Sequence, residues 1–306
     1  MISLRQHVAS LVAVFLALAV GIALGGGPLA SGDDDDQQGS GERDTATPAA
    51  APTPAPDDRS GFADVFADEG AGRLYANGLD GHATAILAMP GADPAHLEAL
   101  ESQIAVAGGA VTGTYTVGDT LFDPAATSPI DDLTTLLIAQ LVDPRVDSSA
   151  PTYERLGQLV GIAMATTEAS SVRADLAAVA VRESLAGPEL LTSPADVRNA
   201  PLVLVVLPLG AEGATSSLAS RTILTGLTSG IAHNAAGVVV VGDETSAEDG
   251  ELAALREGEL TGTVSTVDGI ETTIGQVTAV LALEAAIAGT TGSFGASGSD
   301  GAVPLG

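Results

Sequence analysis

The sequence predicts an α/β fold behind an N-terminal transmembrane helix and a disordered linker. Two runs of aliphatic residues, at 202–207 and 238–241, show no polar alternation, which is typical of strands buried on both faces of a parallel sheet. Segments with apolar residues at helical spacing separate the expected strands, and glycine or proline marks their ends. Together these patterns predict a Rossmann-like, mainly parallel sheet flanked by helices on both sides.

The first 30 residues predict a membrane anchor. No charged side chain occurs from Val8 to Ala30, and a spanning helix needs roughly 20 mostly apolar residues. Arg5 precedes this stretch and Asp33–Asp36 follow it, so we expect membrane contact through residues 8–29 and a cytoplasmic N-terminus. A cleaved secretory signal is the alternative, although its apolar region is usually only ~7–15 residues long. Both interpretations predict that the rest of the chain is exported.

Residues 31–60 predict a disordered linker rich in Pro, Ala and Asp. They contain no Val, Ile, Leu or aromatic residue, so no apolar burial offsets the entropy lost on ordering. The Pro-Ala part, Pro48–Pro56, favours the extended backbone of a spacer. The predicted organisation is therefore an anchor at 1–30, a linker at 31–60 and an extracytoplasmic α/β domain at 61–306.

A first strand–helix–strand unit is expected at 83–117. An apolar strand at 84–89 leads to Asp93 and Pro94, which supply an N-cap and a proline at the first helical position. A Gly-Gly pair ends this helix, and a second strand is expected at 110–117. Proline or serine start signals and leucine-rich faces then predict three helices, at about 128–143, 151–168 and 172–185.

A second strand–helix–strand unit is expected at 202–241, around a helix at about 216–233. The acidic segment 243–259 is predicted to be exposed. A short strand at 263–267 and a helix at about 273–288 follow. The tail has the composition of turns and is expected to lack a fixed conformation.

Composition excludes several classes of function. The net charge of −28 repels nucleic acid. The absence of cysteine excludes thiolate metal sites, and the absence of lysine excludes a P-loop. The turn at 89–94 has one glycine, against a dinucleotide fingerprint, and no nucleophile elbow occurs. We therefore expect neither a catalytic constellation nor a bound cofactor, and predict that the chain is not an enzyme.

Histidine and methionine are the remaining candidate soft metal ligands. The candidates are His7, His82, His96, His233, Met89 and Met164. No two histidines have the spacing of a metal pair, which favours surface or helix-end roles for them over metal ligation. The two methionines lie in apolar runs, which favours core packing. No metal ligand set can be assigned from these patterns.

Three stretches carry a resemblance to a known family. They are ISLRQHVASLVAVFLALAVGIALGGGPL at the N-terminus, Ala85–Val117, and Ser265–Gly295. They resemble the actinobacterial MctB family, the mycobacterial copper transport protein B type. The resemblance implies copper transport or efflux across the cell envelope, with an outer-membrane location and copper as the transported ion. If that role holds, one helix cannot enclose a channel by itself, so a homo-oligomer or other envelope transport proteins are the expected partners.

Two other hypotheses follow from the residues themselves. The scarcity of soft ligands and the flexible tether favour a non-transporting extracytoplasmic α/β module, anchored to the membrane, that binds or scaffolds other molecules. An extracytoplasmic hydrolase is the weaker hypothesis. It would require His82, His96 or His233 to lie within hydrogen-bond reach of a serine or a carboxylate in a cleft.

Overall fold

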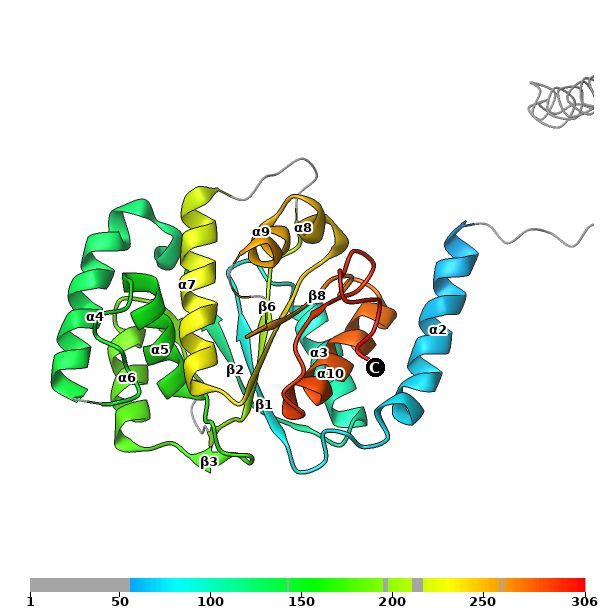
Figure 1. Cartoon of the computed structure of the whole chain (residues 1–306), viewed down its shortest axis with the longest axis horizontal. Coiled ribbons are helices and arrows are strands. Elements are labelled where there is room, and N and C mark those ends of the chain that lie inside the picture. The colour runs from blue at the N-terminus through cyan, green and yellow to red at the C-terminus, as the bar shows by residue number, and fades with distance from the viewer. Residues whose placement is uncertain are drawn as a thin grey trace, which may run out of the picture. The chain divides into compact units, whose positions relative to one another are not determined.

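The computed structural model describes residues 56–141, 143–194, 198–210, 217–258, 260 and 262–305 (Figure 1). These residues form a central sheet of seven strands: β1 (Ala83–Ala88), β2 (Ala110–Val117), β4 (Leu191–Thr192), β6 (Leu202–Val206), β7 (Gly237–Val241), β8 (Ser265–Val267) and β9 (Ser293–Phe294). The strand order is β4-β2-β1-β6-β7-β8-β9. Each pair of neighbours runs parallel except β2 and β4, which are antiparallel. The prediction of a mainly parallel sheet is confirmed.

The strand order places a topological switch point between β1 and β6. From β1 the chain moves outward to β2, returns to β6 on the other side of β1, and then continues outward through β7, β8 and β9. Connections that leave neighbouring strands in opposite directions open a crevice at the carboxyl ends of those strands, where doubly wound proteins bind ligands. The strand order alone therefore predicts a ligand site at the carboxyl ends of β1 and β6.

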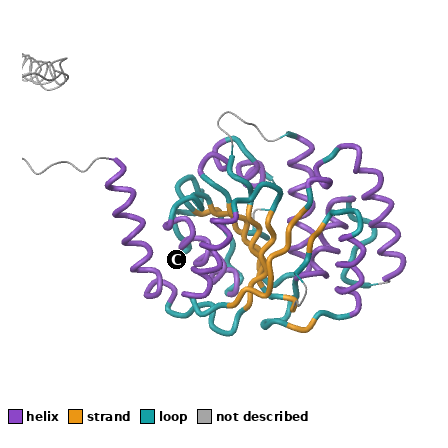
Figure 2. The backbone as a smooth tube through the Cα atoms, turned by 180° about the vertical axis from the view of Figure 1, so that it is seen from behind, coloured by secondary structure: helices purple, strands orange, loops and turns teal. Residues whose placement is uncertain are grey.

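Helices cover both faces of the sheet, as predicted (Figure 2). One face carries α2 (Pro56–Tyr75), α3 (Pro94–Val106) and α10 (Thr273–Ile287). The other carries α4 (Thr127–Leu141), α5 (Thr152–Met164), α6 (Leu176–Ala186), α7 (Leu218–Asn234) and α9 (Glu251–Glu257). In Figure 1 the green and yellow helices lie on one side of the sheet, and the blue, cyan and red ones on the other.

The two aliphatic runs behave as the sequence predicts. Every residue of β6 is buried, and so is β7 after its first glycine. Along β6, Val203 and Val205 join the core under α5 and α7, whereas Leu204 and Val206 join the core under α3 and α10. Successive residues of a strand point to opposite faces, so aliphatic side chains fill both faces of β6.

Glycines allow α5 and α7 to pack closely. A Cβ atom on Gly157 would overlap the carbonyl oxygen of Leu227, and one on Gly230 would overlap that of Glu154. The two backbones therefore approach to a distance that no larger residue allows. This contact fixes α7, whose first turns border the crevice.

The start of α3 confirms its predicted cap. Asp93 Oδ1 accepts a hydrogen bond from the Ala95 amide at 2.9 Å, and Pro94 opens the helix. After α3, Gly108 has a φ of +82°, a left-handed conformation that glycine adopts without strain. The two expected strand–helix–strand units correspond to β1–α3–β2 and β6–α7–β7.

The predicted start of the helix at 172 was wrong. Val172 and Arg173 form strand β3, which pairs antiparallel with β5 (Arg198–Asn199). The helix α6 starts only at Leu176, because Asp175 caps it by accepting a hydrogen bond from the Ala178 amide at 2.7 Å. The cap, rather than the apolar spacing, sets the helix boundary.

The prediction that 243–259 is exposed was also wrong. This segment contains α8 (Glu244–Glu248) and α9. Leu252 and Leu255, three positions apart on α9, are buried in the main core. The density of acidic residues concealed a short amphipathic helix.

The C-terminal tail has a fixed conformation, contrary to expectation. It forms β9 and buries Phe294 against the core under α10. The buried Asp268 carboxylate accepts hydrogen bonds from the backbone amides of Ala296, at 2.6 Å, and Ser297, at 3.0 Å. A carboxylate on a neighbouring segment therefore holds a glycine-rich tail that contains few apolar residues.

The N-terminal predictions concern residues that lie mostly outside the described part of the chain. The first described element, α2, begins at Pro56, so the last five residues of the expected linker are helical. None of the helices among the described residues combines the length and the apolarity needed to cross a bilayer. The predicted anchor at 8–29 lies outside the described residues.

Candidate functional site

A pocket of 440 Å³ occupies the crevice at the carboxyl ends of β1 and β6. Ligand pockets usually measure about 300–1,000 Å³. The residues that line it are Met89, Pro90, Asp119, Phe122, Asp123, Leu207, Pro208, Ser220, Leu224 and Glu251. They come from the turns after β1 and β6, the 3₁₀ helix η1 (Asp119–Phe122), α7 and α9. The pocket thus lies where the strand order predicts a ligand site.

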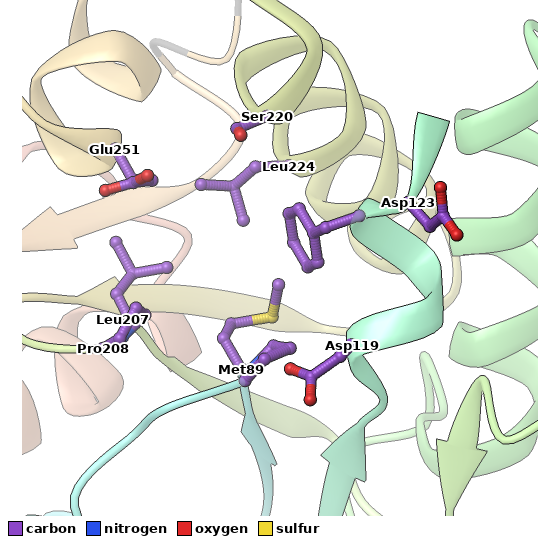
Figure 3. A pocket seen from close by; sticks show the side chains of 10 residues that line it. Met89, Asp119, Asp123, Leu207, Pro208, Ser220, Leu224 and Glu251 are labelled. Carbon is purple, nitrogen blue, oxygen red and sulfur yellow. The ribbon is translucent and has the colours of Figure 1, made fainter. Parts of the chain in front are cut away.

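Apolar side chains form the floor of this pocket. Met89, Leu207 and Leu224 are almost fully buried and converge from three separate elements (Figure 3). Met89 directly follows β1 and Leu207 directly follows β6, so the parallel register of these strands places them side by side. The floor is therefore set by the sheet and by the closely packed α7.

Acidic side chains stand at the rim. Asp119 and Glu251 lie on opposite sides of the pocket (Figure 3), and no described residue forms a hydrogen bond or an ion pair with either carboxylate. Asp123 instead accepts a hydrogen bond from the Ala125 amide at 2.9 Å. None of the described lining residues is basic. The rim therefore carries uncompensated negative charge.

One backbone amide at the start of α3 and one at the start of α7 already have side-chain acceptors. At the start of α3, the Asp93 carboxylate accepts a hydrogen bond from the Ala95 amide. At the start of α7, Ser217 Oγ accepts one from the Ser220 amide at 3.0 Å. Amides at such positions bind phosphate when they are free. These two amides are therefore not free to bind a phosphate group.

The predicted histidines are not brought together. His82 is half-buried just before β1, at the opposite end of the strand from the pocket. His96 lies in the first turn of α3, where its Nδ1 is buried without a partner among the described residues. His233 is exposed in the last turn of α7 and lines a second pocket, of 310 Å³, beside the Arg145–Asp175 ion pair. His7 lies outside the described residues.

Hydrogen bonding of these histidines bears on the hydrolase hypothesis. Within the described part of the chain, no hydrogen bond joins a side chain of His82, His96 or His233 to a serine or a carboxylate. Ser220, the serine that lines the 440 Å³ pocket between β1 and β6, shares a hydrogen bond with Ser217 at 2.8 Å. The contact that a serine hydrolase would need is not formed by these residues.

The two methionines have different positions. Met164 is fully buried at the end of α5, whereas Met89 is buried but lines the pocket. Copper(I) prefers Cys, Met and His ligands, and Met89 is the one such side chain among the described lining residues. The described residues also contain no group of three or more His, Asp or Glu side chains arranged to hold a metal ion.

A buried polar cluster lies on the other face of the sheet, where α2 packs on α3 and α10. The Tyr75 hydroxyl donates to Gln103 Oε1 at 2.8 Å, and Gln103 Nε2 donates to Asp68 at 3.3 Å. Burial raises the pKa of Glu284 on α10 from 4.5 to about 7. Its Oε1 has no partner among the described residues, and its carboxyl group packs against Gly78. This carboxylate therefore opposes folding when it is charged.

Asp268 is the contrasting case. Burial opposes its ionisation, but hydrogen bonds from Ser297 and Arg256 outweigh that effect, so the pKa of Asp268 lies below its usual range. Arg256 Nη1 lies 2.9 Å from Asp268 Oδ2, and Arg256 Nη2 donates to the Phe294 carbonyl oxygen at 2.8 Å. The pair connects α9, which borders the pocket, to the C-terminal tail.

Sequence reasoning missed the acidic rim. Asp119 and Glu251 belong to segments without strong periodicity, and they are separated by more than a hundred residues in the chain. The sequence signal that could have found these residues is their position after predicted strands, because residues that follow parallel strands gather at one edge of the sheet. Its use required the strand order, which the sequence did not reveal.

Comparison with known proteins gives a consistent result over the whole chain. The family model described as "Copper transport outer membrane protein, MctB" matches residues 1–305. Curated relatives named "Copper transporter MctB" include one from Mycobacterium tuberculosis (strain H37Rv), 27% identical over 311 residues, and one from Mycobacterium leprae, 28% identical over 316 residues. Each alignment covers 96% of this chain and 96% of the relative. The chain belongs to the MctB family.

Proposed function

We propose that this chain is an exported, membrane-anchored protein of the cell envelope that takes part in copper efflux. The observation that carries the proposal is the match of the copper-transport family model to residues 1–305. Relatives that carry the name copper transporter align over 96% of the chain, so the likeness includes the N-terminal segment as well as the α/β domain.

The N-terminal sequence supports the topology of the proposal. An uncharged stretch long enough to span a bilayer follows Arg5, and an acidic run follows the stretch. This arrangement holds the N-terminus in the cytoplasm and the α/β domain outside it. A reporter enzyme that folds only outside the cytoplasm, fused after Gly306, is expected to be active, and activity only of a cytoplasmic reporter would contradict the topology.

The mode of action follows from the number of membrane segments. A single helix cannot enclose a channel, so copper passes either through an assembly of several copies or through a separate conduit that this protein assists. The described domain supports the second alternative, because it has a ligand pocket at the switch point of an α/β sheet. The protein would then serve as an accessory subunit of copper efflux.

Deletion of the gene tests the proposal. The deletion strain is expected to retain more copper per cell and to stop growing at a lower copper concentration than the parent, and the full-length gene should reverse both effects. Zinc content, measured in the same samples, controls for general damage to the envelope. Unchanged copper content and unchanged sensitivity would refute the copper role.

That negative result would favour the alternative, a tethered module that binds or scaffolds other envelope molecules without transport. The observation in its favour is the chemistry of the pocket. Met89 is the one soft ligand among the described lining residues, and its neighbours are aliphatic or acidic.

A further inference from the structure

We propose that the pocket between β1 and β6 binds a small organic cation, with an apolar body and a protonated or quaternary amine. The inference goes beyond copper efflux and does not depend on it. It rests on the shape of the pocket, on the charge at its rim and on the lack of basic side chains and converging metal ligands among the lining residues that the structure describes.

The apolar side chains of the pocket fit the apolar body of such a ligand. Met89, Leu207 and Leu224 converge on a space of 440 Å³ (Figure 3). Phe122 also lines this space. Burial of apolar surface stabilises a bound ligand by roughly 25 cal/mol per Å². Phe122 adds an aromatic ring, which attracts a cation placed over its face.

The carboxylates at the rim of the pocket attract the cationic group of such a ligand. Asp119 and Glu251 lie at opposite edges of the pocket, without partners among the described residues. An apolar floor lowers the local dielectric constant, so a ligand cation gains more from these carboxylates than it would in bulk water. None of the described lining residues is basic, so no lining cation pairs with these carboxylates in place of the ligand.

Other ligand classes fit less well. An anion would meet two carboxylates, and the Ala95 amide of α3 and the Ser220 amide of α7 already donate to Asp93 and Ser217. A hard metal ion needs converging oxygen ligands at 2.0–2.6 Å or so, whereas Asp119 and Glu251 stand across the pocket from each other. A ligand with a cationic group on an apolar body can pack against the aliphatic floor and pair with the carboxylates at the rim.

Phenyltrimethylammonium tests the inference against tert-butylbenzene, which has the same shape without the charge. The full chain, in phosphatidylcholine nanodiscs, is labelled with ¹³C at its methionine methyl groups. Met89 reports on the pocket, and Met164, fully buried elsewhere, is an internal control for the fold. The cation is expected to shift the Met89 signal saturably and to leave the Met164 signal in place.

Affinity differences separate charge from shape. We expect the neutral compound to bind on the order of tenfold more weakly than the cation, and Glu251→Gln or Asp119→Asn to weaken cation binding about 2- to 5-fold each. Glu98→Gln, on the exposed part of α3, is the matched control and should change nothing. The variants should leave the affinity for tert-butylbenzene unchanged.

Three results would overturn the inference. These are a Met89 signal that does not respond saturably to the cation, equal affinity for the two compounds, or cation binding that neither acidic variant weakens. An unchanged Met164 signal in each variant shows that the fold is retained, so weaker binding is then due to the lost carboxylate. Failure of this test leaves the copper experiment unaffected, because that experiment measures whole-cell copper.

Discussion

Replacement of Glu284 by glutamine should make the protein more stable at pH 8 and have little effect near pH 5. Burial raises the pKa of Glu284 from 4.5 to about 7, so the folded state holds this proton more tightly than the unfolded state. The stability associated with the protonated form is complete below about pH 4.5 and is lost as the pH rises through about 7. At pH 8 the wild type therefore carries a charged carboxylate whose Oε1 has no partner among the described residues.

The size of the effect follows from the pKa. A rise from 4.5 to about 7 corresponds to roughly 3 kcal/mol for a group shielded from water. Because the Glu284 side chain keeps partial contact with solvent, we expect about 1–2 kcal/mol. Glutamine keeps the volume that packs against Gly78 and removes the charge.

Urea unfolding followed by circular dichroism at pH 5 and pH 8 measures the effect. The variant should shift the midpoint upward at pH 8 without a change in slope. Glu98→Gln, on an exposed surface, is the control and should shift neither midpoint. An equal gain in stability at both pH values, or a loss of stability at pH 8, would refute the conclusion that the charged Glu284 carboxylate destabilises the folded state.

Two further predictions concern packing and the tail. Gly230→Ala should destabilise the protein by about 1–3 kcal/mol, because the added methyl group would overlap the Glu154 carbonyl oxygen. Gly70→Ala, in open space on α2, should stabilise the protein by about 0.5–1 kcal/mol. Thermal unfolding of both variants measures these changes, and equal effects of the two substitutions would contradict the prediction. Asp268→Asn should cost about 2–4 kcal/mol near neutral pH, because Arg256 loses its buried partner. Since the pKa of Asp268 is lowered by folding, the difference from wild type should shrink as the pH falls through the acid range, and a pH-independent difference would refute it.

The strands β6 and β7 could be predicted because neither has a polar face. Burial on both sides leaves only aliphatic residues in β6 and β7, and this pattern is visible in a single sequence. The order of the strands could not be predicted in the same way. Five parallel neighbour pairs and one antiparallel pair depend on contacts between distant segments, which local periodicity does not encode.

The errors have a common physical cause. At α9 and in the tail, a few long-range contacts fix segments whose composition is typical of exposed loops. Leu252 on α9 is buried despite its acidic neighbours, and Phe294 is held in place by Asp268 and Arg256 from elsewhere in the chain. The same limitation applies to the site, because Asp119 and Glu251 come to line one pocket only after the sheet has formed. Met89, by contrast, was noticed in the sequence for its chemistry, although packing was expected to be its role.

The central claim is that the α/β domain supports copper efflux from outside the cytoplasm. The most direct measurement is the copper content of a deletion strain that carries either the full-length gene or a gene for residues 31–306, which keeps the domain in the cytoplasm. With equal amounts of folded protein verified by immunoblot, the account predicts that only the full-length chain restores low cellular copper. Restoration by residues 31–306 alone, or by neither gene, would contradict it.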